Sequence, residues 1–290
     1  RHPTIDAART LAHAGLLSGV HESSGGVDGW VSVEVSPALA HDTEGTIEAA
    51  RELSRNLALD NLYVKVPATA EGIEAIRVLT SEGILVNVTL IFGLERYADV
   101  IEAYLSGLEA HKGTLSHISS VGSFFISRVD TEVDRRLTEV GTDDALDLLG
   151  TAAITQGKLA YQLAMTAFSG SRWDVLEERG AKLQRPLWAS TSTKNPEYPD
   201  TYYVDSLIGP NTVNTLPEAT LEAFDDHGNL VSTLDASPEA DQKRWEQLGE
   251  LVDLDEVSAK LEAEGVASFA TSFDEVLATL AERVGPSVDG

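Results

Sequence analysis

The chain has 290 residues, of which 42% are hydrophobic, so it is long enough for one large α/β barrel or two smaller domains. Its 47 acidic and 21 basic side chains give a formal net charge of −26, which argues against nucleic acid or an anionic membrane as a partner. The absence of cysteine excludes a disulfide framework and a thiolate metal site, and without a visible signal peptide or an apolar run of membrane length we expect a cytoplasmic protein.

Strand-like and helix-like segments alternate along the chain, which is typical of parallel β/α units. A first helix is expected over residues 3–17. Strands are then expected over residues 30–36, 62–68, 84–92, 117–127, 185–190 and 212–216. Helices are expected over residues 43–56, 71–82, 94–111, 142–168 and 218–226, with Pro217 as the first helical residue of the last one. After Ser237 and Pro238 the pattern predicts three more helices and no strand. No long linker divides the chain, so we expect one barrel domain over 1–290, with a helix and loop over 1–29, the barrel over 30–228 and a helical segment over 229–290.

Three successive strands carry polar side chains on only one of their two faces. In 30–36 the polar face includes Glu34, in 62–68 it includes Lys65, and in 84–92 it holds Asn87 and Thr89, while the even-numbered residues of that strand form an apolar face. Helices cover both sides of a doubly wound sheet, so its strands are nearly continuous apolar runs. Isolated polar groups on one face fit better inside a closed barrel, where they reach an active site at the C-terminal ends of the strands.

Lys65 is the most informative residue, because branched apolar residues flank it and leave it no obvious solvent face. Burying an ammonium is costly, which favours the neutral amine, and a neutral amine on a rigid strand is the nucleophile that forms a Schiff base with a carbonyl substrate. Glu34 is expected on the neighbouring strand and on the same face, where a carboxylate could shuttle protons. The alternative interpretation is a buried structural ion pair.

Two further basic side chains follow predicted strands. Arg128 could hold a phosphate through a bidentate fork, or it could form a surface ion pair with Asp130, Glu132 or Asp134. Lys194 lies in a polar loop that suits an anion, although a solvated lysine is the commoner outcome. No dinucleotide or Walker fingerprint and no closely spaced histidine pair is present, so neither a nucleotide-binding fold nor a histidine-rich metal site is indicated.

Several ordered runs together resemble transaldolase. They are VSVEV at 31–35, VKVPAT at 64–69, NVTLIF at 87–92, SFFISRVD at 123–130, RPLWAST at 185–191 and TVNTLPE at 212–218. The resemblance covers essentially residues 27–228, and the helical tail resembles the longer bacterial form. It implies a (β/α)8 TIM barrel of the class I aldolase type with extra C-terminal helices. It also implies an enzyme of the pentose phosphate pathway that transfers a dihydroxyacetone unit between sugar phosphates, as a monomer or homodimer, without a metal or another cofactor.

The resemblance also implies roles for individual residues around the lysine. Lys65 matches the Schiff-base lysine of the family, Glu34 the glutamate that works with a catalytic water, and Thr89 the threonine that helps to hold this water. Asn87 matches an amide that contacts the hydroxyl groups of the donor.

The remaining matches concern the pocket and the phosphate. Ser123 and Ser190 match serines of the pocket, Phe125 matches an aromatic wall, and Arg128 matches a phosphate-binding arginine. Lys194 stands near the place of a second phosphate-binding arginine, with different local spacing.

The chain departs from the family pattern before residue 30. The family carries an acid/base aspartate on its first barrel strand and a donor-binding asparagine on its second, and only six of eight strands are predicted here, none of which supplies these two residues. We therefore expect either a barrel that is incomplete at the N-terminus or a degraded relative, in which carbon–carbon cleavage is impaired. The alternatives are an aldolase that releases dihydroxyacetone without transferring it, and a catalytically impaired barrel that serves as a scaffold.

Overall fold

The computed structural model describes residues 4–234 and 238–284. Six strands form one parallel sheet in chain order, and each lies within its predicted range. The strands are β1 (Val31–Glu34), β2 (Leu62–Pro67), β3 (Val86–Ile91), β4 (Ser120–Phe125), β5 (Arg185–Ala189) and β6 (Val213–Asn214).

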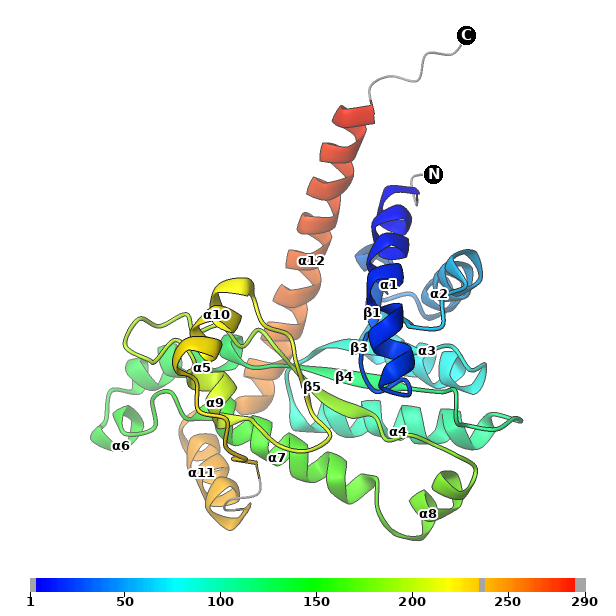
Figure 1. The fold of residues 1–290 in the computed structure, drawn as a ribbon. Helices are drawn as coiled ribbons and strands as arrows, with labels where there is room; N and C mark the ends of the chain where they lie inside the picture. The colour runs from blue at the N-terminus through cyan, green and yellow to red at the C-terminus, as the bar shows by residue number, and fades with distance from the viewer. Residues whose placement is uncertain (1–3, 235–237, 285–290) are drawn as a thin grey trace.

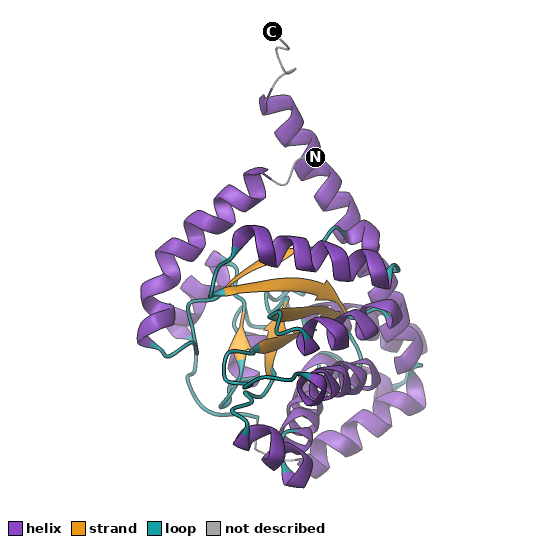
Figure 2. Ribbon diagram, turned by 90° about the vertical axis from the view of Figure 1, so that its right-hand side faces the viewer, coloured by secondary structure: helices purple, strands orange, loops and turns teal. Residues whose placement is uncertain are grey.

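Helices surround the sheet, and the strands lie inside them (Figure 2). The helical segments are α1 (Thr4–Ser23), the 3-10 turn η1 (Pro37–Leu39), α2 (Thr43–Leu57), α3 (Ala70–Ser81), α4 (Leu94–Ala110), α5 (Ser127–Val140), α6 (Asp143–Leu146), α7 (Ala152–Ala167), α8 (Gly170–Glu178), α9 (Tyr202–Ser206), α10 (Glu218–His227), α11 (Pro238–Leu251) and α12 (Leu254–Val284). None of these described helices is both long and apolar enough to span a bilayer.

The described strands form a curled, half-barrel sheet in which β1 and β6 are the two edges. The alternation of β2 separates a core face from a polar inner face: Val64 and Val66 are 1% and 0% exposed and pack in the core, while Lys65 between them faces the other way and is partly exposed. The strands therefore have two different faces, as the sequence predicted. Helices cover the apolar outer face, and the inner face carries the polar side chains.

The expected alternation in the third strand fails at its C-terminal end. Leu90 has a φ of 61°, and the pairing of β3 with β4 shifts register between Val88 and Ile91. Such an irregularity inserts an extra residue and changes the direction of the side chains that follow it. As a result Phe92 forms a ring contact with Phe125 of β4, with the ring centroids 4.9 Å apart.

Three predictions about helices were wrong. The single helix expected over 142–168 is two helices, because Gly150, with a φ of 70°, interrupts it where its N–H donates to Asp134. Pro217 is the N-cap of α10 and not its first helical residue. Within the described residues 238–284 the tail holds two helices and not three, because α12 continues for 31 residues, and its C-terminal part extends away from the rest of the molecule (Figure 1).

The first helix continues beyond its predicted end, to Ser23. The expected start at Pro3 and the expected boundary at Ser237 lie outside the described residues. The helices α5, α8 and α9 were not foreseen, and α5 matters for the site because it starts directly after β4 and carries Arg128 in its first turn.

Candidate active site

Lys65 and Glu34 lie side by side on the inner face of the half-barrel. They are register partners on β2 and β1, and Lys65 Nζ lies 3.6 Å from Glu34 Oε1. The side chains are 24% and 27% exposed, so the expectation of a lysine without a solvent face was wrong. Because the strands present both groups to an accessible interior, a substrate carbonyl can approach the amine while the carboxylate remains next to it.

Burial raises the pKa of Glu34 above its ordinary value, and the attraction of Lys65 opposes that rise. Desolvation disfavours the charged carboxylate, whereas a neighbouring ammonium favours it. A carboxyl group whose pKa is raised toward neutrality exchanges protons more readily at physiological pH than an ordinary surface glutamate. The electrostatics of Glu34 therefore suit a proton donor and acceptor next to an amine.

A chain of hydrogen bonds crosses the inner face beside this pair. Asn87, the register partner of Lys65 on β3, donates from Nδ2 to Ser32 Oγ at 3.1 Å and accepts at Oδ1 from Ser123 Oγ at 2.7 Å. The amide is thus held in one orientation by hydroxyl groups from β1 and β4. This arrangement brings together Asn87 and Ser123, two of the predicted site residues, and adds Ser32, which was not among them.

Thr89 is the second polar residue that β3 was predicted to place on the inner face. It is 1% exposed, and it lies opposite Pro67 in the pairing of β3 with β2. Its side chain makes no hydrogen bond to another residue of the described ranges, so the hydroxyl group is not committed to the fold.

Three aromatic rings form a wall next to the lysine. Phe125 packs against Phe92, and the Phe269 ring of α12 lies 6.5 Å from the Phe125 ring in an edge-on orientation. Phe269 also faces the lysine directly, with Lys65 Nζ 5.3 Å from its ring centroid. Of these three rings, only Phe125 was predicted from the sequence. Nothing in the local pattern of a tail helix identifies Phe269, since only the tertiary structure brings α12 over β2 and β4.

Arg128 lies at the start of α5 with its guanidinium carbon 5.7 Å from the centre of the Phe125 ring. The surface ion pair that sequence analysis offered as an alternative does not form with any described residue, because the three acidic candidates have other partners. Asp130 accepts hydrogen bonds from Ala153 and Tyr203, Glu132 binds Arg135, Arg136 and Lys260, and Asp134 binds Gly150 and Tyr198. Arg128 is left available for an anion beside the aromatic wall.

Ser190 follows the C-terminal end of β5 in a left-handed conformation, with a φ of 57°. Its hydroxyl group lies 3.0 Å from the hydroxyl group of Ser127, which is next to Arg128. A non-glycine residue in this region of φ costs free energy, and such residues concentrate at functional sites. The two serines therefore place hydroxyl groups near the base of Arg128, at the end of the sheet where parallel strands present their loops.

Lys194 is exposed in the loop that follows β5, and its Nζ donates to Ser192 Oγ at 2.8 Å. No contact joins it to the residues around Lys65 in the described chain, so the structure does not bring it into the site in this conformation. The described residues also contain no group of three or more histidine, aspartate or glutamate side chains arranged to hold a metal ion.

Comparison with known proteins gives a consistent result over nearly the whole chain. A family model described as transaldolase/fructose-6-phosphate aldolase matches residues 4–280. A transaldolase of Frankia alni is 48% identical over 289 residues, which are 98% of this chain and 78% of that protein. A transaldolase of Mycolicibacterium smegmatis is 49% identical over 96% of this chain and 76% of its own length, and one of Renibacterium salmoninarum is 50% identical over 90% and 71%. The chain belongs to the transaldolase/fructose-6-phosphate aldolase family.

Proposed function

We propose that this protein is a transaldolase that transfers a dihydroxyacetone unit between sugar phosphates through a Schiff base on Lys65. The observation that carries the proposal is the Lys65–Glu34 pair, 3.6 Å apart on adjacent parallel strands and accessible from the interior of the sheet. Relatives named transaldolase support the same activity. On this proposal the six strands belong to a (β/α)8 barrel of the class I aldolase type, whose active site lies at the C-terminal ends of the strands.

Imine formation uses the amine and the neighbouring carboxyl group. Lys65 Nζ, as the neutral amine, attacks the ketose carbonyl carbon and forms a carbinolamine. The proton that the nitrogen loses passes to the carbonyl oxygen, and Glu34 in its protonated form donates a second proton to the resulting hydroxyl group, which leaves as water and gives the iminium cation. The raised pKa of Glu34 supports this proton transfer, because at a given pH a larger fraction of this carboxyl group is protonated than of an ordinary glutamate. Thr89, whose side chain makes no hydrogen bond within the described ranges, is the residue that we assign to holding this water.

The iminium then serves as the electron sink for cleavage of the C3–C4 bond. The bonding electrons move into the iminium to form an enamine, the C4 hydroxyl group passes its proton through a water to the Glu34 carboxylate, and an aldose phosphate departs. The enamine attacks the aldehyde carbon of an acceptor, and water hydrolyses the new iminium to free Lys65. Asn87, held between Ser32 and Ser123, is positioned to bind the hydroxyl groups of the dihydroxyacetone unit.

We assign the substrate phosphate to Arg128, since its guanidinium makes no ion pair within the described chain and rests on the ring of Phe125. Arginine presents a planar fork that matches two phosphate oxygens. Ser190 and Ser127 supply hydroxyl groups beside it. Lys194 would need a movement of its exposed loop to contribute, so we give it at most a secondary role.

Borohydride trapping tests the proposal directly. Incubation with fructose 6-phosphate and sodium borohydride should add the mass of the reduced adduct to the peptide that contains Lys65, and Lys65→Met should abolish this label. In parallel, release of glyceraldehyde 3-phosphate reports cleavage and the gain of three carbons by an acceptor aldehyde reports transfer. An unlabelled Lys65 in the folded protein would contradict the proposal, whereas labelling without cleavage would assign imine formation to these residues and cleavage to a group beyond them.

A second activity is favoured by the family description, which includes fructose-6-phosphate aldolase. An aldolase of this kind protonates the enamine and releases free dihydroxyacetone. The two activities are separated by product analysis with and without an acceptor aldehyde: a transaldolase accumulates products only when the acceptor is present, and an aldolase releases dihydroxyacetone without it.

A further inference from the structure

We propose that Phe269 of α12 is a positioning residue for the Schiff base, which holds the cationic nitrogen of Lys65 against its ring and closes the pocket from the side opposite the strands. The inference rests on the proposed function. Lys65 Nζ lies 5.3 Å from the centre of the Phe269 ring, within the roughly 6 Å at which an aromatic face attracts a cation. The lysine nitrogen therefore lies close to both a carboxylate and an aromatic ring.

The Phe269 ring is part of a continuous wall and not an isolated contact. It meets Phe125 edge-on at 6.5 Å, and Phe125 in turn meets Phe92 at 4.9 Å. The same Phe125 ring supports Arg128. An apolar surface thus extends from the reactive nitrogen to the proposed phosphate-binding group, so a sugar phosphate that spans the two would lie along it.

Close packing fixes the height of α12 above the sheet. Gly265 lies one turn before Phe269, and a Cβ atom at this glycine would be 3.0 Å from Leu90 and 3.3 Å from Phe92. Nearer the N-terminus of α12, Ser258 Oγ donates to the carbonyl oxygen of Phe92 at 3.1 Å. The bulge at Leu90 therefore faces α12, and the absence of a side chain at residue 265 allows the helix to come near enough for Phe269 to reach Lys65.

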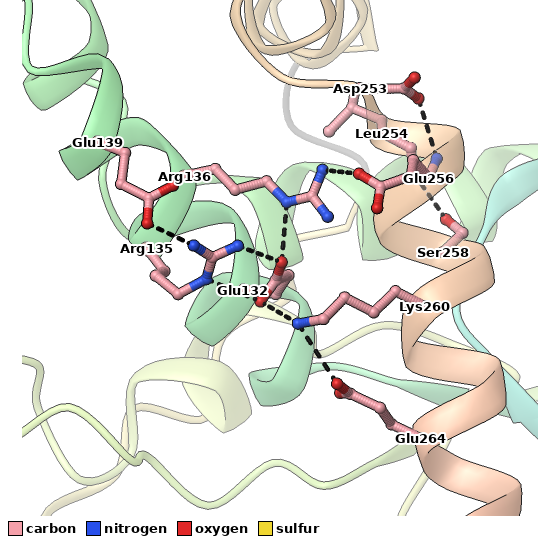
Figure 3. Close-up of polar contacts among 10 residues, drawn as sticks. All are labelled: Glu132, Arg135, Arg136, Glu139, Asp253, Leu254, Glu256, Ser258, Lys260 and Glu264. Atoms are coloured by element: carbon pink, nitrogen blue, oxygen red, sulfur yellow. Dashed lines mark hydrogen bonds and ion pairs between the residues drawn. The ribbon is translucent and has the colours of Figure 1, made fainter.

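An ion-pair network holds α12 to α5 (Figure 3). Its centre is Glu132 of α5, whose side chain is 7% exposed and accepts from Lys260 of α12 at 2.6 Å and from Arg136 at 2.8 Å. Arg136 also binds Glu256 of α12. On the opposite side, Arg96 of α4 binds Glu262 at 3.2 Å. These contacts tie the helix that carries Phe269 to the helix that begins next to Arg128.

The ring has a selective effect because the intermediates differ in charge. The iminium is a cation, whereas the carbinolamine and the enamine are neutral. An aromatic face stabilises the charged species, so it favours the iminium over the neutral carbinolamine and enamine. The ring also displaces water from the nitrogen, which disfavours loss of the three-carbon unit by hydrolysis before an acceptor arrives. Both effects change how the bound three-carbon unit divides between transfer to an acceptor and release as free dihydroxyacetone, and neither changes the fold.

The test compares Phe269→Leu with Phe273→Leu, a matched control one turn further along the same helix whose ring has no aromatic partner in the described chain. With subsaturating fructose 6-phosphate, Phe269→Leu should reduce borohydride trapping at Lys65 by about fivefold. It should also increase the share of dihydroxyacetone that is released free and not transferred. Phe273→Leu should behave like wild type in both measurements.

Phenylalanine analogues with one, two and three ring fluorines at residue 269 give a second test that preserves shape. Fluorination weakens the negative face of the ring, so trapping should fall progressively across the series. Lys260→Met removes the ion pair between Lys260 of α12 and Glu132 of α5. It should also increase the share of free dihydroxyacetone, but by less than Phe269→Leu does. Wild-type trapping and partition in both Phe269→Leu and the fluorinated series would overturn the inference. Failure of wild-type protein to trap at Lys65 would instead overturn the proposed function.

Discussion

At the residue scale, the environment of Glu34 distinguishes it from most other acidic side chains in this protein. Surface carboxylates such as Glu74 and Glu102 have a lowered pKa because an arginine binds them. Glu34 instead has a raised pKa because burial outweighs its attraction to Lys65. A perturbed acid beside an amine, in an accessible interior, is the combination that a proton-transfer step requires.

Replacement of Glu34 by Gln tests this role. The amide keeps the shape of the side chain but does not exchange protons, so kcat should fall by about 10²–10⁴-fold. The acidic limb of the wild-type pH–rate profile, which should lie above the ordinary titration range of a glutamate, should disappear in Glu34→Gln. Steady-state kinetics between pH 5 and 9 measure both effects. An unchanged kcat with an unchanged acidic limb would reduce the Lys65–Glu34 contact to a structural ion pair.

Arg128→Lys tests the phosphate assignment. Lysine keeps the charge but loses the planar fork, and one lost hydrogen bond to a charged group costs roughly 1.5–3 kcal/mol. The KM for fructose 6-phosphate should therefore rise by about tenfold or more. Imine trapping with unphosphorylated dihydroxyacetone is the control, since it needs no phosphate site and should be unaffected. Equal losses with both compounds would place the effect of Arg128 outside phosphate recognition.

At the element scale, Asp130 joins α5 to the start of α7. It is 1% exposed, and it accepts from the N–H of Ala153 at 2.7 Å and from the hydroxyl group of Tyr203 at 2.9 Å. The contact satisfies a donor in the first turn of α7 that has no partner within the helix. Burial raises the pKa of Asp130 to about 7, although these two hydrogen bonds oppose the rise. The junction that positions α5, and with it Arg128, therefore contains a carboxyl group that titrates near neutrality.

This raised pKa predicts a pH-dependent stability. Because the folded pKa of Asp130 is above its ordinary value of 3.8, the folded state holds the proton more tightly, and stability is lost as pH rises toward and through 7. Urea unfolding at pH 5 and pH 8 should show that the free energy of unfolding declines by roughly 2–4 kcal/mol in wild type. Asp130→Asn, which retains an acceptor for Ala153, should show little of this decline. The same decline in both proteins would assign the pH dependence to other groups.

At the scale of the whole molecule, the charge balance works against the compact state. Even if every basic side chain had an acidic partner, 26 acidic side chains would remain. A net charge of this size destabilises a folded protein through self-repulsion. Three basic side chains, Arg135, Arg136 and Lys260, nevertheless converge on Glu132 where α5 meets α12.

Salt should therefore stabilise the protein. Raising NaCl from about 10 mM to about 150 mM shortens the Debye length from about 30 Å to about 8 Å, which screens long-range repulsion more than contacts between paired groups. The midpoint of thermal unfolding at pH 7 should rise across this range in differential scanning calorimetry. A midpoint that falls with salt would mean that the ion-pair networks contribute more to stability than the excess negative charge removes.

Much of the fold follows from local pattern. All six strands were predicted within their ranges, because a half-buried strand must alternate, and the strands alternate clearly from Val31 to Val66. The break between α6 and α7 was missed because it depends on Asp134 and Tyr198, which are distant in sequence from Gly150. The tail was predicted as three helices because the weak periodicity of residues 254–284 does not show that they form one continuous helix.

By itself the sequence determined which polar side chains share the inner face, since period-two alternation places Glu34, Lys65 and Asn87 on the same side of adjacent parallel strands whatever the rest of the chain does. Only the tertiary structure decided that Leu90 bulges, that Arg128 lacks an acidic partner in the described chain, and that Phe269 of a distant helix covers the lysine. The physical reason is range. Alternation is a property of a few consecutive bonds, whereas the packing of α12 on β3 and α5 depends on contacts between residues more than a hundred positions apart.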